Sequence, residues 1–300
     1  MAAGPDQALN NPPVLLSGAS GQIGVFVIPR LLAAGFRVAA VSRKGKPQGY
    51  PGFERVEWIT ERDVLETAGR YHYLVSAGPL EIAKKFLSAC ENIQRAVVFS
   101  SSSVVSKRTS GDRAERNQIQ DMLSIESEIR SISAGRGLQL VIFRPTLIYG
   151  CGMDTNISLL AGWIRRFGFL PVNGIAAGLR QPVHADDLAA AAVMAISSQY
   201  DLPDVLNLAG GETLSFADMV RKIFPAVGKQ TRLLQLPQWL FVLAANLVNV
   251  IRPAGGINGE MVRRQRLDLV FDDRQARELL GYRPRPFNPQ AGDFRLPGAE

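Results

Sequence analysis

The sequence predicts an α/β fold in which a doubly wound parallel sheet is combined with a smaller C-terminal lobe. Two observations lead to this class. The first half of the chain alternates short apolar runs with helical segments, as parallel sheets covered by helices do. A glycine-rich turn, "GASGQIG", separates the first apolar run from the first helical segment. With 300 residues, the chain is long enough to bury the core of such a sheet.

Each predicted element follows from its local pattern. The apolar runs predict strands over residues 14–16, 37–42, 55–60, 73–78, 95–101 and 138–145. Helical spacing predicts helices over residues 22–34, 80–90 and 118–133. After residue 150 the alternation loosens, which predicts the smaller lobe over residues 151–300, with residues 180–209 returning to the first domain. Residues 1–12 are expected to form a flexible leader before the sheet domain of residues 13–150.

Composition excludes several classes of function. The two cysteines, Cys90 and Cys151, are too few for a disulfide framework, and no histidine or cysteine cluster indicates a metal. We therefore expect a reduced, cytoplasmic protein without a signal peptide or a metal. The net charge of +7 comes without a nucleic-acid-binding motif. A phosphate-bearing small molecule fits this charge better than nucleic acid does.

One apolar stretch, residues 236–251, raises the question of a membrane. It has about 16 residues and falls short of the roughly 20 needed to cross a bilayer. We expect it to pack over a substrate pocket and to make no membrane contact. The alternative is peripheral contact with a membrane, helped by arginines at positions 263, 264 and 266.

The glycine-rich turn predicts a dinucleotide site. Its three glycines, Gly18, Gly21 and Gly24, permit a tight turn, a close approach of the backbone to pyrophosphate, and close packing of helix on strand. The helix that follows offers its positive end to the phosphates. The residues between and after these glycines complete the predicted contact, and they are Ser20, Gln22 and Ile23.

The end of the second strand predicts which dinucleotide binds. NAD sites usually place an acidic residue there, whereas this chain has Ser42, Arg43 and Lys44. Basic side chains at this point pair with the 2′-phosphate of NADP, so we expect NADP in preference to NAD. Asp63, after the third strand, is expected to meet the adenine.

The order of the motifs resembles that of a known family. "GASGQIG", "FSSSSVV", "RPTLIYGCG", "RQPVHADDLA" and "DLVFDDRQARELLGYRPRPF" follow one another as in the extended short-chain dehydrogenase/reductases. The chain is most similar to their epimerase/dehydratase branch, which acts on nucleotide sugars through a Rossmann-type fold. Residues 152–174 also resemble proteins of bacterial surface-polysaccharide synthesis.

The resemblance implies roles for several residues. Ser102 or Ser103 matches the serine that hydrogen-bonds the reacting oxygen, and Tyr149 is a candidate acid. Pro145 lines the nicotinamide and Thr146 the sugar. Five further residues are assigned together with these motifs. Arg180, Arg264 and Arg266 are expected near substrate phosphates, with a solvated helix face as the alternative for the last two, and His184 is expected to be structural together with Asp187.

The resemblance also exposes a gap. The family relies on Tyr-x-x-x-Lys, in which the lysine and the cofactor lower the tyrosine pKa for proton exchange. None of the six tyrosines has a lysine four residues later. Counting back from Glu128, which matches the glutamate that follows the lysine, places Gln120 and Ser124 at the two positions.

Two functions remain open from the sequence. One is an NADP-binding, epimerase-like oxidoreductase that acts on a nucleotide-linked sugar with atypical acid/base groups, for which Tyr149, Lys107 or a water on Ser102 could substitute. The other is a catalytically silent cofactor-binding sensor or assembly partner. The substrate, the reaction direction and the oligomeric state, including a homodimer, stay undetermined.

Overall fold

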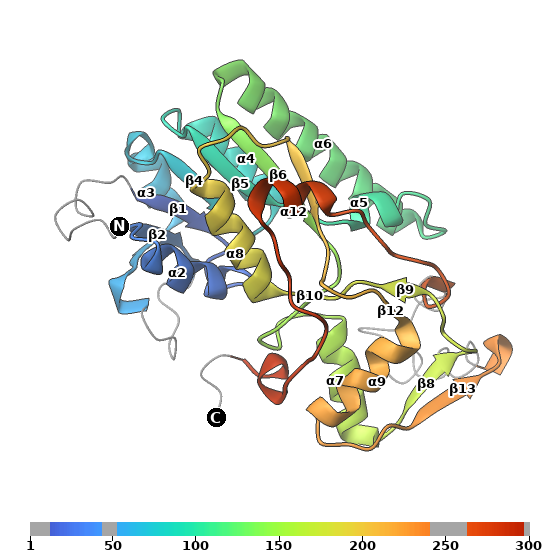
Figure 1. The fold of residues 1–300 in the computed structure, drawn as a ribbon. Coiled ribbons are helices and arrows are strands. Elements are labelled where there is room, and N and C mark those ends of the chain that lie inside the picture. The colour runs from blue at the N-terminus through green and yellow to red at the C-terminus, as the bar shows by residue number, and fades with distance from the viewer. Residues whose placement is uncertain (1–12, 44–52, 241–262, 297–300) are drawn as a thin grey trace.

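Seven parallel strands form the centre of the molecule in a computed structural model that describes residues 13–43, 53–240 and 263–296 (Figure 1). Their order across the sheet is β11-β6-β5-β4-β1-β2-β3, and all neighbouring pairs run parallel. The strands are β1 (Val14–Ser17), β2 (Val38–Val41), β3 (Glu57–Ile59), β4 (Tyr73–Ser76), β5 (Arg95–Phe99), β6 (Gln139–Pro145) and β11 (Val205–Leu208). The predicted doubly wound α/β sheet is confirmed.

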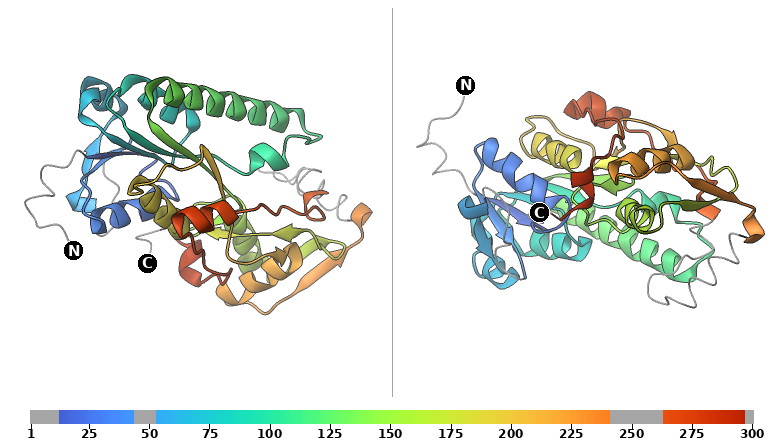
Figure 2. Two further views of the ribbon diagram at one scale, coloured as in Figure 1. Left: turned by 45° about the horizontal axis from the view of Figure 1, so that its top comes forward. Right: turned by 90° about the horizontal axis from the view of Figure 1, so that it is seen from below.

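Helices cover both faces of the sheet (Figures 1 and 2). One face carries α2 (Gly24–Ala33), α8 (Ala185–Ile196) and α12 (Arg274–Leu280). The other carries α3 (Glu61–Glu66), α4 (Leu80–Ala89) and α6 (Arg113–Arg136). The inner strands are buried on both faces, which explains why their sequences are continuous apolar runs.

The smaller lobe is built after β6. It contains α7 (Ile157–Phe167), β8 (Leu170–Asn173), α9 (Phe216–Ala226) and β13 (Leu233–Leu236) around a core of its own. Short two-residue strands connect it to the sheet, namely β7 (Ile148–Tyr149), β9 (Leu179–Arg180), β10 (Val183–His184) and β12 (Leu214–Ser215). Three 3-10 turns, at Phe53–Arg55, Ala68–Arg70 and Ala291–Phe294, and the short α5 (Ser103–Ser106) complete the described elements.

Residues far along the chain return to the large sheet. The strand β11 pairs with β6, and α8 packs beside α2. How the chain divides into functional domains stays a prediction. The predicted leader and most of the apolar stretch 236–251 lie outside the described residues. Within the described part, no helix is long and apolar enough to cross a membrane.

The long helix α6 begins five residues before its predicted start. Asp112 precedes it, and its carboxylate accepts a hydrogen bond from the Ala114 amide at 2.8 Å. A side-chain cap of this kind satisfies amide groups that the first turn leaves unpaired. At the other end Gly137 ends the helix with φ = 65°, in the left-handed region that favours glycine.

A buried ion pair fixes the rotation of α6 about its axis. The Glu126 side chain is fully buried, and its carboxylate accepts hydrogen bonds from the Arg144 guanidinium and the Ser100 hydroxyl. Arg144 lies in β6 and Ser100 directly follows β5, so the pair joins helix to sheet. A buried carboxylate without such partners would be strongly unfavourable. The face of α6 that carries Glu126 must therefore point at the sheet.

Replacing Glu126 with alanine should leave the Arg144 guanidinium without its carboxylate. We expect Glu126→Ala to lower the free energy of unfolding by about 3–5 kcal/mol. Glu128→Ala is the matched control, because Glu128 forms only an exposed pair with Lys84. That control should cost about 0–1 kcal/mol. Urea denaturation measures both, and equal losses would contradict the assignment of Glu126 as the buried partner.

Candidate functional site

The glycine-rich turn lies where the sheet reverses its winding order. The chain moves from β1 outward to β2 and β3, then crosses back to β4 on the other side of β1. In open α/β sheets, ligands bind outside the carboxyl ends of the strands at this point. The turn after β1 and the loop after β4 meet there. A Cβ on Gly18 would lie 2.5 Å from the Ala77 carbonyl carbon, so only glycine fits.

The three glycines have different roles in this turn. A Cβ on Gly24 would lie 2.2 Å from the Gly18 carbonyl oxygen, so this glycine lets α2 start directly behind the turn. A Cβ on Gly21 would approach a single protein atom closely, the Gly18 oxygen at 3.1 Å. Packing within the protein therefore excludes a side chain at Gly18 and Gly24, whereas at Gly21 it makes only one tight contact. The predicted approach of a ligand to Gly21 stays a prediction.

The N-terminus of α2 follows this turn. The residue before the helix, Ile23, has no side chain that can cap it, and no acidic residue lies in the first turn. The positive end of the helix dipole is thus not neutralised from within the helix. Ser20 is exposed on the turn. The Gln22 side-chain amide donates to the Gly150 carbonyl at 3.1 Å, which ties the turn to the segment after β7.

The end of β2 lacks an acidic side chain, as the sequence indicates. Ser42 is buried, its amide bonded to the Ile59 carbonyl, and Arg43 is exposed beside it. Lys44, the third residue of the predicted 2′-phosphate contact, lies outside the described residues. Asp63 has a structural task, since its carboxylate bonds the Thr60 amide and hydroxyl in a capping box of α3. Its predicted adenine contact stays a prediction.

The serines after β5 lie at the same edge of the sheet. The Ser102 amide donates to the Pro145 carbonyl at 3.0 Å, which places the two predicted nicotinamide-side residues together. Ser102 is buried, while Ser103 is half-buried and begins α5. The Thr146 hydroxyl donates to the Gln181 carbonyl. That bond holds the end of β6 against the segment before β10, and any contact of Thr146 with substrate stays a prediction.

Tyr149 is a packing residue. Its side chain is 1% exposed and lies edge-on to the rings of His184 and Phe287, each 4.9 Å away between centroids. Burial raises the pKa of Tyr149 well above its ordinary value, which opposes ionisation. These contacts give Tyr149 a packing role, and its predicted role as the missing acid stays a prediction.

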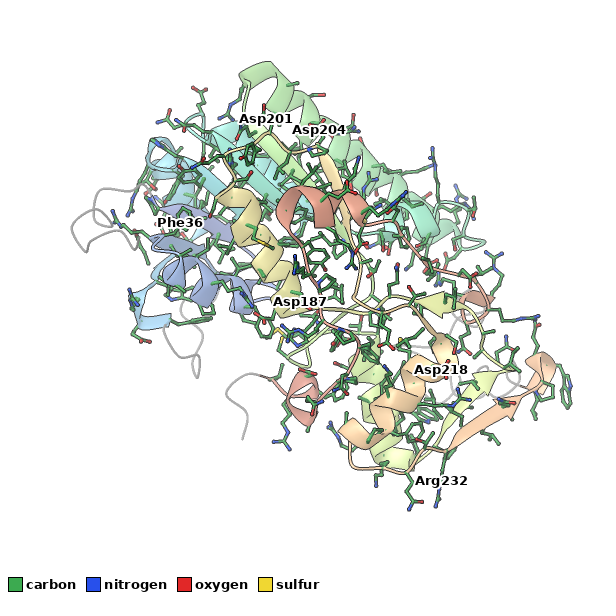
Figure 3. The ribbon with its side chains drawn as sticks, viewed as in Figure 1. Phe36, Asp187, Asp201, Asp204, Asp218 and Arg232 are labelled. Carbon is green, nitrogen blue, oxygen red and sulfur yellow. The ribbon has the colours of Figure 1, made fainter. Side chains whose placement is uncertain are left out.

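His184 and Asp187 are structural, as predicted. His184 Nδ1 accepts the Asp186 amide at the start of α8, and Nε2 bonds the Asp293 carboxylate at 3.1 Å. The Asp187 carboxylate, labelled in Figure 3, accepts the Arg285 amide and guanidinium. Together these contacts hold the C-terminal segment against α8.

Arg180 is buried and donates to main-chain carbonyls. Its guanidinium bonds the carbonyls of Leu179 and Leu267 at 2.7 Å, and that of Arg264. Desolvation lowers the pKa of Arg180 to about 10. The side chain thus fixes residues 264–267 to the lobe. Its predicted contact with a diphosphate stays a prediction.

Arg264 has a different partner from the one expected. Its guanidinium makes a two-bond contact with the Glu115 carboxylate, at 2.7 and 2.9 Å. Lys107 and Ser110 bond the same carboxylate at 3.0 and 2.8 Å. Arg264 is therefore not on a solvated helix face, and its predicted phosphate contact stays a prediction. Arg266 is exposed and bonds Gln238 at 3.3 Å, so its phosphate contact stays a prediction.

This cluster, made of Lys107, Ser110, Glu115 and Arg264, joins the two lobes. Lys107 directly follows α5 and Glu115 lies in the first turn of α6, whereas Arg264 comes from the C-terminal part of the chain. Lys107, a sequence candidate for proton transfer, is thereby held by a carboxylate. Neither Glu115 nor its partners form a motif, so no local pattern in the sequence indicates the cluster.

The structure offers a second register for the missing Tyr-x-x-x-Lys pair. Gln120, Ser124 and Glu128 are all exposed on α6, and the glutamate that faces the sheet is Glu126. The same count made from Glu126 places Gln118, which is also exposed, and the half-buried Met122 at the two positions. The signal was present in the sequence, because Glu126 continues the apolar face of Ile119 and Ile129, seven residues after one and three before the other.

The second register also lacks the proton-exchanging pair. Gln118 and Met122 cannot exchange a proton near neutral pH.

Among the described residues, no group of three or more histidine, cysteine, aspartate or glutamate side chains could hold a metal ion.

The fold and the sequence can now be compared with known proteins. The UDP-N-acetylglucosamine 4-epimerase of Bacillus cereus superposes with a TM-score of 0.69 at 17% identity, covering 95% of this chain and 98% of that one. The UDP-glucose 4-epimerase of Thermus thermophilus, solved with NAD, gives 0.65 at 18% identity, covering 94% and 97%. The chain has the fold of the extended short-chain dehydrogenase/reductases.

Sequence comparisons give two relatives. An uncharacterized protein of Sinorhizobium fredii, y4nG, is 25% identical over 92% of this chain and 76% of its own length. The UDP-glucose 4-epimerase of Vibrio cholerae is 26% identical over 53% of this chain and 46% of its own length. No protein-family model matches the chain.

The Glu115 cluster predicts a dependence of stability on pH. Its hydrogen bonds, that from Arg264 first, lower the pKa of Glu115 to about 2, whereas an unfolded glutamate titrates near about 4.3. The cluster therefore stabilises the fold above about pH 4, and this contribution is lost as the pH falls toward about 2. Glu115→Gln should cost about 1–2 kcal/mol at neutral pH after allowance for solvent screening.

Thermal unfolding of both proteins across this pH range measures the difference. Glu66→Gln is the control, because Glu66 forms an exposed pair with Arg62. It should change stability by about 0–0.5 kcal/mol at every pH. Equal melting temperatures of Glu115→Gln and the natural protein at neutral pH would contradict the role given to the cluster.

Proposed function

We propose that the protein binds a nicotinamide dinucleotide at the carboxyl edge of the sheet. The observation that carries this proposal is the turn between β1 and α2, where packing excludes a side chain at Gly18 and Gly24 but makes only one tight contact at Gly21. The uncapped end of α2 suits pyrophosphate, since an anion there is stabilised by amide groups and the helix dipole. Ser102 and Pro145 lie together at the same sheet edge, where the nicotinamide is expected.

Within this proposal, NADP is preferred to NAD. The end of β2 carries Arg43 where NAD sites usually carry a carboxylate. A guanidinium pairs well with a phosphate dianion, whereas it gives a ribose diol little advantage. The related epimerase from Thermus thermophilus was solved with NAD. The preference for NADP over NAD that we propose therefore rests on this chain's own residues.

The substrate we propose is a nucleotide-linked sugar, and the reaction is of the oxidoreductase or epimerase type. Relatives by fold and by sequence are epimerases of such sugars. A bound nicotinamide would exchange hydride with a carbinol carbon of the sugar. Ser102 or Ser103 would hydrogen-bond the reacting oxygen. Its proton needs an acceptor other than the usual tyrosine, because Gln118 and Met122 occupy the relevant positions.

The missing proton relay also favours a second function. A protein that keeps the dinucleotide site but lacks the proton relay can act as a silent sensor of the cofactor or as an assembly partner. The relay normally contributes about two to four orders of magnitude in rate. Slow chemistry and no chemistry are thus the two outcomes that this site supports.

Two wider assignments complete the proposal. Both cysteines are buried with free thiols, which suits a reduced, cytoplasmic compartment. A place in surface-polysaccharide synthesis rests on the resemblance of residues 152–174 alone.

Isothermal titration calorimetry with NADPH and NADH tests the cofactor assignment. We expect NADPH to bind at least about tenfold more tightly than NADH, since tenfold corresponds to about 1.4 kcal/mol. Arg43→Ala should reduce this difference in affinity, because it should weaken the binding of NADPH and leave the binding of NADH unchanged. Gly21→Val should abolish binding of both, because its side chain would occupy the space of the pyrophosphate.

Two controls separate binding from folding. Gly135→Val changes a glycine whose Cβ would meet no atom within 4 Å, so binding of both cofactors should survive. Circular dichroism should show that Gly21→Val remains folded. Undiminished NADPH affinity in folded Gly21→Val would show that the dinucleotide binds elsewhere. Equal affinities of the natural protein for both cofactors would refute the preference for NADP.

A further inference from the structure

The smaller lobe exposes large apolar side chains on its outer side. The surface at the end of α7 and the start of the β8–β13 pair, here named the α7–β13 face, includes Leu234 at 48% exposure, Phe167 at 47% and Phe169 at 37%. Ile175, Trp239 and Leu159 are exposed elsewhere on the lobe. Single exposed apolar residues need no explanation, but several on adjoining elements indicate a surface that binds something.

Ring contacts join the aromatic side chains of this face. On α7, Trp163 and Phe167 lie four residues apart along one stripe. The rings of Trp163 and Phe167 lie 4.5 Å apart, and those of Phe167 and Phe169 lie 6.5 Å apart.

The paired strands extend the surface. Leu170 pairs with Leu233, and both side chains contribute to the core of the lobe. The next pair, Pro171 and Leu234, therefore points outward, because neighbouring residues of a strand face opposite sides.

Several cations lie on the same lobe. Residues 155–185 contain three arginines, and residues 219–259 contain five lysines or arginines. Of these, Arg180 is buried, and Arg221 and Lys222 form ion pairs with Asp218 and Glu212. In Figure 3, Arg232 lies at the far end of this lobe.

Several of these cations border the apolar side chains. Arg165 and Arg166 are exposed at the end of α7, and the Arg166 guanidinium lies over the Phe167 ring at 5.3 Å. The Arg232 carbonyl accepts the Leu170 amide, which places Arg232 at the start of the β8–β13 pair. No carboxylate in the described part of the chain forms an ion pair with Arg165, Arg166 or Arg232.

We propose that the α7–β13 face docks the protein on an anionic lipid bilayer. Aromatic and aliphatic side chains would enter the boundary between headgroups and acyl chains, and the bordering cations would face anionic headgroups. Charge selects this occupant over a second copy of the chain, because two such faces would bring unpaired cations together. In Figure 1, β8 and β13 lie at the far end of the lobe from the sheet, whereas α7 lies nearer to β10.

Sedimentation with lipid vesicles tests this proposal without any cofactor. The protein should bind vesicles of phosphatidylglycerol and phosphatidylcholine, and bind vesicles of phosphatidylcholine alone at least about tenfold more weakly, because the arginines then meet no anionic headgroups. Arg165→Glu with Arg166→Glu should weaken binding to the anionic vesicles by at least about tenfold. Phe169→Ala should also weaken this binding, through the apolar contact. Added salt should weaken binding by screening.

Matched variants remote from the face serve as controls. Arg62→Glu with Arg113→Glu changes the net charge equally from α3 and α6, and Tyr200→Ala removes another exposed aromatic side chain. Both should bind as the natural protein does. Absence of vesicle binding, or equal weakening by the control pair, would overturn the proposal. So would a dimer in light scattering that Phe169→Ala dissociates, because the face would then join two copies.

Discussion

The close contact between two backbone turns is the constraint on which the candidate site depends. Without a side chain, Gly18 lets the turn after β1 touch Ala77 after β4, and Gly24 lets α2 begin against the same turn. The two strands that flank the reversal of the sheet are thereby held edge to edge with their loops in contact. Gln22 then joins this turn to Gly150, so the entry to the smaller lobe is positioned from the turn as well.

Buried charges fix the positions of the elements that the glycine-rich turn does not contact. Glu126 and Arg144 set the rotation of α6, Arg180 holds residues 264–267, and Glu115 with Arg264 joins the lobes. Each is a charge removed from water, which is stable only with a bonded partner. The lobes are thus held by a few specific bonds. Removal of one bonded partner therefore lowers stability more than the surface area that its side chain buries would indicate.

Much of the fold could be predicted from the sequence, because buried parallel strands are continuous apolar runs and glycine turns have strict local geometry. The site was harder to predict. Tyr149 lies in a family motif but packs in a core, and no local pattern distinguishes these two uses. The pairing of Glu115 with Arg264 joins residues far apart in the chain. The register at Gln120 depends on choosing Glu128 over Glu126, although helical spacing favours Glu126.

The central claim is that the chain keeps a dinucleotide site and lacks the proton relay of its structural relatives. The most direct measurement is the rate of nicotinamide reduction with UDP-glucose and UDP-glucuronic acid, followed by absorbance. Gln118→Tyr with Met122→Lys should raise a slow natural rate by about 100-fold. Gln120→Tyr with Ser124→Lys, on the exposed face, should not change it. Fast turnover by the natural protein, reduced by the first pair, would contradict the account.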